Sequence, residues 1–138
     1  MGRRPPAWLI ERTAGLAGVE LHADVPDVRP FLSRASLMIV PLRIGGGSRL
    51  KILEALATGL PVVSTTVGAE GLALRHAHEL ILADEPVPMA EAVAEVLKNP
   101  VAAAEIAERG RQVVLANYDW DVLADKLEEV WNKCLQPC

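Results

Sequence analysis

Two apolar runs of strand length stand on either side of an amphipathic segment between residues 36 and 65, and this arrangement most restricts the fold. The first run is SLMIVPL (36–42) and the second is PVVST (61–65). A continuous apolar run of this length is typical of a strand that is covered on both faces. Two such strands joined by a helix form the βαβ unit of a parallel sheet. The sequence therefore predicts an α/β protein.

The same alternation continues through the first two thirds of the chain. Further short strands are predicted at Val19–Ala23, where apolar and polar residues alternate, and at 79–83. Residues 67–78 are predicted to form a loop. Proline, aspartate and glycine mark the ends of the helices, which we expect within residues 5–18, 27–35, 48–58, 86–99, 100–118 and 119–135. The pattern predicts a partial Rossmann-like parallel sheet with helices on both faces and a helical C-terminal end.

The length of the chain bounds the number of domains. A chain of 138 residues suits one domain, so we expect a single domain over 1–138 that finishes with helices over 99–138. Four strands are few for a doubly wound sheet, and the chain starts on a helix. We therefore expect that this domain is truncated at its N-terminus. Hydrophobic residues make up 51% and aromatic residues 4%, which predicts an aliphatic core.

Charge and composition argue against several classes of function. The net charge of -4 disfavours a protein that coats a nucleic-acid duplex, which normally carries a basic excess. No apolar run approaches 18 residues, so no membrane span is predicted. The two cysteines, Cys134 and Cys138, form no disulfide framework or metal motif. A cytoplasmic location fits these features.

A glycine-rich turn follows the first apolar run. Ligands of parallel sheets bind beyond the carboxyl ends of the strands, and Gly45, Gly46 and Gly47 would let a ligand approach the backbone closely. Ser48 is expected to begin the next helix, whose first N–H groups have no intrahelical partner. Those donors and the helix dipole favour an anion, and phosphate is the natural candidate.

One edge of the predicted helix carries charged groups. On a helical wheel, Lys51, Glu54 and Thr58 fall close together, and Arg49 lies in the first turn. This order would match a sugar-linked diphosphate, with phosphates on the amides and cations and a ribose diol on the carboxylate. Two other interpretations stay open, namely a turn that binds nothing and a solvated Lys51–Glu54 ion pair. A separate arc is expected to face the core, formed by Leu50, Leu53, Leu56 and Ala57.

Two familiar phosphate-binding motifs do not fit this segment. A P-loop needs G-x-x-x-x-G-K-[ST], which the chain lacks. The dinucleotide fingerprint G-x-G-x-x-G would place its last glycine on Leu50, and the strand 61–65 ends in hydroxyl residues where that fold carries an acid. A phosphate-binding enzyme of another Rossmann type is therefore a weaker interpretation.

The residues from Val25 to about Leu72 resemble the C-terminal domain of GT-B glycosyltransferases, specifically glycosyltransferase family 4, the glycosyl transferases group 1 enzymes. The resemblance is carried by VPDVRPFLSRASLMIVPLRIGGGSRLKILEALATGLPVVSTTVGAEGL, and YDWDVLADKLEEVW is similar to the last helix of that family. In the family an E-x7-E motif spans this turn and helix. Its second glutamate matches Glu54, while its first falls on Gly46, which departs from the pattern in the manner of a family branch with GGGxRxK.

The resemblance implies roles for individual residues. Glu54 would hold the ribose of a nucleotide-sugar donor, and Arg49 and Lys51 would face the donor diphosphate. Glu70, which follows the strand at 61–65, could help to close the donor pocket, although it could equally be an exposed loop acid. The complete set of expected donor-binding residues is Gly45, Gly46, Gly47, Ser48, Arg49, Lys51, Glu54 and Glu70. No catalytic residue is assigned.

The resemblance implies part of a retaining enzyme that moves a hexose-like sugar from a UDP- or GDP-sugar to a glycan or lipid acceptor. No cofactor or metal is expected, and His76 and His78 fit a surface loop better than a metal site. The acceptor site would belong to an N-terminal domain, so this chain alone is expected to be inactive. The alternative is a non-catalytic half-domain that binds a partner chain or forms a homodimer.

Overall fold

The computed structural model describes residues 4–135 of the chain. Contacts between residues divide the chain into two compact units, Met1–Phe31 and Leu32–Cys138. The sequence predicts one domain over 1–138, whereas the structure separates the first 31 residues from the rest. The predicted glycine turn and every strand lie in the second unit.

The first unit contains α1 (Ala7–Ala14) and the start of α2 (Arg29–Leu32). Pro6 precedes α1 and Gly15 follows it, as the sequence predicts. Asp27 caps α2 by accepting a hydrogen bond from the Arg29 N–H at 3.0 Å. The strand predicted at Val19–Ala23 is wrong, because this segment forms no strand. Val19 is 46% exposed, so the alternating pattern has no buried face that could favour an extended pairing.

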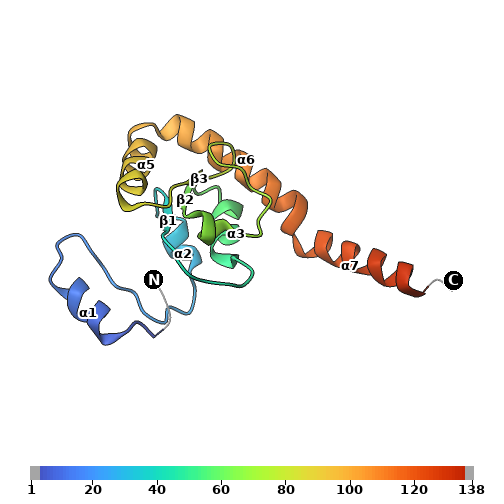
Figure 1. Ribbon diagram of the computed structural model, residues 1–138, viewed down its shortest axis with the longest axis horizontal. Helices are drawn as coiled ribbons and strands as arrows, with labels where there is room; N and C mark the ends of the chain where they lie inside the picture. Colours follow the sequence, from blue (N-terminus) through green and yellow to red (C-terminus); the bar gives the residue numbers. More distant parts are fainter. Residues whose placement is uncertain (1–3, 136–138) are drawn as a thin grey trace. The chain divides into compact units, whose positions relative to one another are not determined.

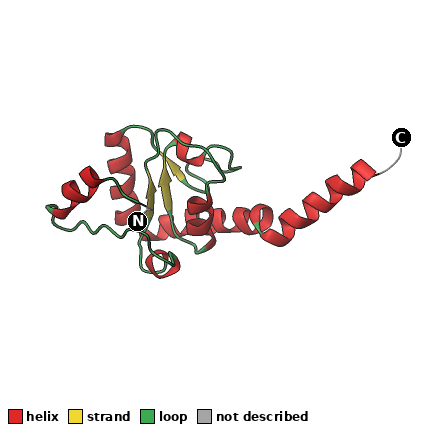
Figure 2. Ribbon diagram, turned by 90° about the horizontal axis from the view of Figure 1, so that it is seen from below, coloured by secondary structure: helices red, strands yellow, loops and turns green. Residues whose placement is uncertain are grey.

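The second unit is built on a parallel sheet, as predicted. Its strands are β1 (Met38–Val40), β2 (Val62–Ser64) and β3 (Ile81–Leu82), in the order β1-β2-β3. Both strand pairs are parallel, with Ile39 opposite Val63 and Val63 opposite Ile81. The sheet lies between helices in the view of Figure 2. The α/β class and the parallel sheet are therefore confirmed, with three strands in the described residues instead of four.

Different helices pack on the two faces of the sheet (Figure 1). On one face, Val63 packs with Val96 of α5 (Pro86–Lys98) and with Ala103 of α6 (Pro100–Tyr118). On the other face lie α3 (Leu50–Ala57) and α4 (Thr66–Ala69). β1 is an edge strand, and Ile39 is 46% exposed. The prediction that both faces of this strand are covered is therefore wrong for β1, whereas β2 is buried at every residue.

The helix after the glycines differs from the prediction at its start. It begins at Leu50 and not at Ser48, because Arg49 adopts a left-handed conformation with φ 54°. The expected core arc is also shifted, since Leu50 is 56% exposed. The helix residues that are buried are Ile52, Ala55 and Leu56. The predicted loop over 67–78 is partly helical, because α4 begins directly after β2.

The C-terminal helices end the chain as predicted. Within α6, Gly110 lies so close to α3 that a Cβ there would be 2.7 Å from Leu56 Cδ2. The last helix, α7 (Trp120–Leu135), has an aspartate cap, since Asp119 accepts a hydrogen bond from the Asp121 N–H at 3.1 Å. None of its residues is buried. Cys134 is a free, exposed thiol, and Cys138 lies outside the described residues.

Candidate functional site

Polar residues gather where the three parallel strands end. The glycine turn follows β1, Thr65 follows β2 and Asp84 follows β3 by two residues. Because the strands are parallel, their carboxyl ends meet at one edge of the sheet. This edge is where we expect a ligand of such a fold to bind.

The glycine turn leaves its backbone open to the surroundings. Gly45, Gly46 and Gly47 are all exposed. A Cβ placed at Gly46 or Gly47 would meet no other atom within 4 Å. Gly47 has a φ of +96°, a conformation that favours glycine. Space for a ligand is therefore open beside Gly46 and Gly47, whereas a Cβ at Gly45 would be 3.6 Å from Arg49 Nη1.

The N-terminus of α3 offers amide donors beside this turn. The N–H of Ile52 donates to the carbonyl oxygen of Arg49 at 2.9 Å. The N–H groups of Leu50 and Lys51 have no acceptor among residues 4–135. Free amides and the positive end of the helix dipole both favour an anion at this position. The donors are thus those of residues 50 and 51, while Ser48 lies in the turn that precedes the helix.

Arg49 is not a free surface cation. Its side chain is only 5% exposed. Nε donates to the Glu70 carbonyl oxygen at 3.3 Å, and Nη2 donates to the Gly45 carbonyl oxygen at 3.2 Å and to Glu70 Oε2 at 3.3 Å. The guanidinium therefore connects the glycine turn to the residue that follows α4. The sequence predicts that Arg49 faces the diphosphate, and it gives no sign of this link to Glu70.

Lys51 and Glu54 lie on the exposed side of α3. Both residues are exposed, and no ion pair joins them in the described part of the chain. The rise of an α-helix places Glu54 about 6 Å along the axis from Leu50. An ammonium close to the free amides and a carboxylate one turn later are thus both available to a ligand.

Hydroxyl groups hold the ends of the strands in place beside the turn. Thr65 Oγ1 donates to the carbonyl oxygen of Leu42 and accepts the Gly68 N–H at 2.9 Å. Asp84 accepts the Thr66 N–H at 2.7 Å and the Thr66 hydroxyl at 2.8 Å. These two hydrogen bonds lower the pKa of the Asp84 carboxyl below its ordinary value. Asp84 is absent from the sequence-based set, although its place after a strand would have indicated it.

A hollow of about 540 Å³ opens at the same edge of the sheet. Pro41 and apolar residues of β1 and α5 line most of it, and polar groups come from Arg43, Thr65, Asp84 and Glu85. Arg43 is exposed and pairs with no carboxylate in the described residues. Sequence reasoning missed this cation, which stands between β1 and the glycines.

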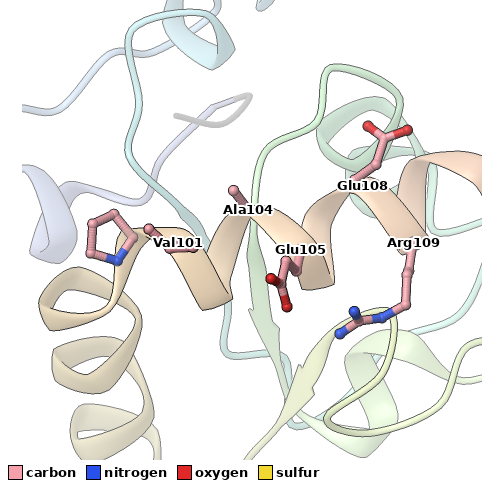
Figure 3. Close-up of a pocket in the computed structure, with 6 residues that line it drawn as sticks. Val101, Ala104, Glu105, Glu108 and Arg109 are labelled. Carbon is pink, nitrogen blue, oxygen red and sulfur yellow. The ribbon is translucent and has the colours of Figure 1, made fainter.

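A second hollow, of about 650 Å³, lies along α6 (Figure 3). Its lining residues all come from that one helix, and they include none of the predicted site residues. Arg109, at one end, donates to the His78 carbonyl oxygen at 2.8 Å. This surface is open to solvent and brings no groups together from different elements. The lining residues are Pro100, Val101, Ala104, Glu105, Glu108 and Arg109.

The described residues hold no group of three or more histidine, cysteine or acidic side chains that could bind a metal. His76 Nδ1 accepts the Leu82 N–H at 2.9 Å, and His78 Nδ1 lies 2.7 Å from Glu79 Oε1. Both histidines are exposed. Their ring nitrogens thus contact the protein itself in this loop. No helix within residues 4–135 has the length and apolar character needed to cross a membrane.

Comparison with known proteins decides the family. The family model described as glycosyl transferases group 1 matches residues 1–99, which is more than two thirds of the chain and includes the whole glycine turn and α3. The chain belongs to the glycosyl transferases group 1 family. The open turn, the free amides of α3 and Glu54 are therefore part of a glycosyltransferase sequence.

Curated relatives agree with this family. The chain is 30% identical over 140 residues to a D-inositol 3-phosphate glycosyltransferase of Salinispora tropica, which covers 97% of this chain and 29% of the relative. It is 32% identical over 123 residues to a GDP-mannose-dependent alpha-(1-6)-phosphatidylinositol monomannoside mannosyltransferase of Mycobacterium tuberculosis, which covers 85% of this chain and 31% of the relative. The chain thus spans less than a third of the length of these relatives.

A solved structure shows the same fold. The C-terminal domain of a glycosyl transferase group 1 family protein from Francisella tularensis matches with a TM-score of 0.65 and 18% identity. The match covers 74% of this chain and 53% of that domain. The parallel sheet and its helices are thus those of a GT-B glycosyltransferase domain.

Proposed function

We propose that this chain supplies the nucleotide-diphosphate-sugar-binding part of a retaining glycosyltransferase, which moves a hexose-like sugar to a glycan or lipid acceptor. The observation that carries the proposal is the unobstructed glycine turn beside the free amides of α3, within a segment that matches the glycosyl transferases group 1 model. Retention of the anomeric configuration follows from the family resemblance alone. We propose a UDP- or GDP-sugar as donor.

The donor would lie across the carboxyl edge of the sheet. Its diphosphate would accept hydrogen bonds from the amides of Gly46, Gly47, Leu50 and Lys51, and the Lys51 ammonium would offset its charge. As the sugar leaves, negative charge grows on the diphosphate, and preorganised amides stabilise that charge without having to reorient. Glu54 would accept hydrogen bonds from the two ribose hydroxyls. No metal or cofactor enters this proposal.

The activity of a whole enzyme would need more protein than this chain. The curated relatives are more than three times as long as the part that matches. We propose that the acceptor site lies in an N-terminal domain, and that the 138-residue chain binds nucleotide weakly and transfers no sugar by itself. We also propose a cytoplasmic location, where nucleotide sugars would be its substrates. We propose no nucleic-acid partner.

One observation favours the alternative of a non-catalytic interaction module. The described part of α7 carries an exposed apolar stripe with no buried residue. Such a surface is unusual on a monomer and favours association with another chain or a homodimer. A dimer that forms with rising concentration, together with no response to any nucleotide, would support this alternative. The stripe consists of Trp120, Leu123, Leu127, Val130, Trp131 and Leu135.

Titration calorimetry of the 138-residue chain with UDP and GDP tests the donor-binding proposal, with NAD as a non-donor nucleotide. The Glu54→Ala variant should weaken binding of the preferred diphosphate about tenfold, because hydrogen bonds to a charged partner contribute roughly 1.5–3 kcal/mol. Glu91→Ala is the matched control, since Glu91 is an exposed glutamate on α5 that forms no ion pair among residues 4–135. It should leave the affinity unchanged.

A modified ligand shows whether Glu54 holds the ribose. The 2′,3′-dideoxy form of the same nucleotide should bind the unmodified chain about tenfold more weakly and should bind Glu54→Ala no more weakly than the natural nucleotide does. If Glu54→Ala and Glu91→Ala bind the nucleotide equally well, the ribose role of Glu54 is wrong. If neither UDP nor GDP binds the unmodified chain, the donor-binding proposal fails.

A further inference from the structure

The Arg49 side chain is buried in a part of the protein where a cation is expected to meet phosphate. It is 5% exposed, and all of its hydrogen bonds go to Gly45 and Glu70. Its backbone is also unusual, because φ is 54° in a residue other than glycine. Such a conformation persists where the surrounding structure holds it in place. Here the three side-chain hydrogen bonds provide that support.

The hydrogen bond to Gly45 fixes the direction of a neighbouring amide. In a trans peptide the C=O of one residue and the N–H of the next point in opposite directions. No peptide bond in the described chain is cis. Since the Gly45 carbonyl oxygen accepts from Arg49 Nη2 at 3.2 Å, the Gly46 N–H points away from the guanidinium. The Gly46 N–H has no acceptor among residues 4–135, and Gly46 is exposed, so this amide is available to a ligand.

Glu70 holds the guanidinium in the position that makes this possible. Its carbonyl oxygen accepts from Nε at 3.3 Å and its carboxylate from Nη2 at 3.3 Å. The Glu70 side chain is 73% exposed, so it can be substituted without leaving a cavity in the core. Thr65 acts in a similar way at the other end of the segment, where its hydroxyl donates to the Leu42 carbonyl oxygen.

We infer that Arg49 is a positioning residue, which together with Glu70 turns the Gly45–Gly46 peptide so that the Gly46 N–H faces the donor diphosphate. Arg49 therefore acts on the phosphate through the backbone of the turn, and Lys51 and the amides contact the phosphate. This inference rests on the proposed function for its ligand, whereas the effect on the turn exists without any ligand.

Electrostatics and positioning predict opposite effects for one substitution. Glu70→Ala removes a negative charge near the proposed phosphate site, so Coulomb attraction alone would make a diphosphate bind more tightly. If Glu70 works through Arg49, the same change loosens the turn and weakens binding. We expect Glu70→Ala to bind GDP or UDP about three- to tenfold more weakly, as measured by calorimetry. Glu91→Ala, the exposed control on α5, should not change the affinity.

A double-mutant cycle shows whether Glu70 acts through Arg49. Arg49→Lys keeps the positive charge but cannot reach both partners with a planar fork. Adding Glu70→Ala to Arg49→Lys should cause no further loss of affinity, because the link is already broken. Equal or tighter binding by Glu70→Ala, or fully additive losses in the double variant, would overturn the inference.

The turn can be followed without nucleotide, which separates this inference from the proposed function. Backbone ¹⁵N order parameters of Gly45, Gly46 and Gly47 report motion on the picosecond to nanosecond timescale. They should fall in Glu70→Ala and in Arg49→Lys, and stay unchanged in Glu91→Ala. Unchanged order parameters in both variants would contradict the positioning role even if nucleotide binds. Lower order parameters in a chain that binds no nucleotide would confirm the link and refute the donor-binding proposal.

Discussion

At the scale of the residue, Glu79 shows how one buried carboxylate organises a loop. Its side chain is 2% exposed. Arg75 donates to it from the side chain, with Nη2 at 2.6 Å from Oε1, and from the backbone N–H at 2.7 Å. Together with His78 Nδ1 at 2.7 Å, these contacts outweigh the effect of burial and lower the pKa of Glu79 to about 2.

The lowered pKa of Glu79 predicts a pH-dependent contribution to stability. A carboxyl group whose pKa is lower in the folded than in the unfolded chain stabilises the fold above its unfolded pKa, and the effect is lost as the pH falls through the folded value. Glu79→Gln should therefore reduce the free energy of unfolding at pH 7 by roughly 1–3 kcal/mol. The difference between variant and unmodified chain should shrink from about pH 4.5 towards pH 2.

Urea unfolding at a series of pH values measures this difference. Glu91→Gln, an exposed site on α5, should differ little from the unmodified chain at any pH. The role assigned to Glu79 is wrong if the loss in Glu79→Gln is the same at pH 7 and at pH 2.5.

Only the residue roles that follow from regular helical spacing could be predicted from the sequence. The exposed edge of Lys51 and Glu54 was predictable, because helical periodicity alone places these residues on one side of α3. The link between Arg49 and Glu70 was not, since the two residues are 21 positions apart and Arg49 leaves the helical conformation. Spacing rules assume helical geometry at residue 49, and the left-handed backbone removes that assumption.

At the scale of the element, α6 depends on a close approach to α3. Gly110 is buried in the middle of α6, and a Cβ there would be 2.7 Å from the Glu79 carbonyl oxygen and from Leu56 Cδ2. A backbone oxygen cannot move aside as a flexible side chain can. The lack of a side chain at residue 110 is therefore required by the packing of these elements.

Gly110→Ala separates this packing effect from helix propensity. Propensity alone predicts that alanine in a helix interior stabilises by about 0.8–1 kcal/mol relative to glycine. Overpacking predicts the opposite sign, with a loss of about 1–3 kcal/mol. We expect a lower midpoint of urea unfolding for Gly110→Ala. Gly15→Ala is the control, because a Cβ there meets no atom within 4 Å. A Gly110→Ala chain as stable as the unmodified one would refute the packing argument.

The elements themselves were largely predictable because most have clear signals. Pro86 and Pro100 mark the starts of α5 and α6, and the apolar run at 61–65 contains the fully buried β2. The prediction of a strand at Val19–Ala23 is wrong, because a short alternating segment forms a strand only where a neighbouring strand pairs with it. Whether a short segment finds such a partner depends on tertiary contacts, which the local pattern does not contain.

At the scale of the whole molecule, the two compact units divide the chain unequally. The donor-binding residues and the three strands all lie in Leu32–Cys138. The family model begins at residue 1 and ends at residue 99, so it includes the whole first unit and stops before α6. The division at Phe31 was not visible in the sequence, because helix and strand signals continue across it.

Donor binding by this chain depends on a diphosphate that binds at the start of α3. We expect the 138-residue chain to bind GDP or UDP through this edge of the sheet and to bind the corresponding nucleoside far more weakly, because the nucleoside lacks the anion that the amides recognise. Chemical shifts of the backbone amides report each donor of the site separately and in one titration.

The most direct measurement is therefore a ¹H–¹⁵N titration of the chain with each diphosphate and with its nucleoside. We expect GDP or UDP to shift the amide resonances of Gly46, Gly47, Leu50 and Lys51 strongly, and guanosine or uridine at equal concentration to leave them unshifted. The proposed diphosphate site is wrong if neither diphosphate shifts these four amide resonances, or if the nucleosides shift them equally.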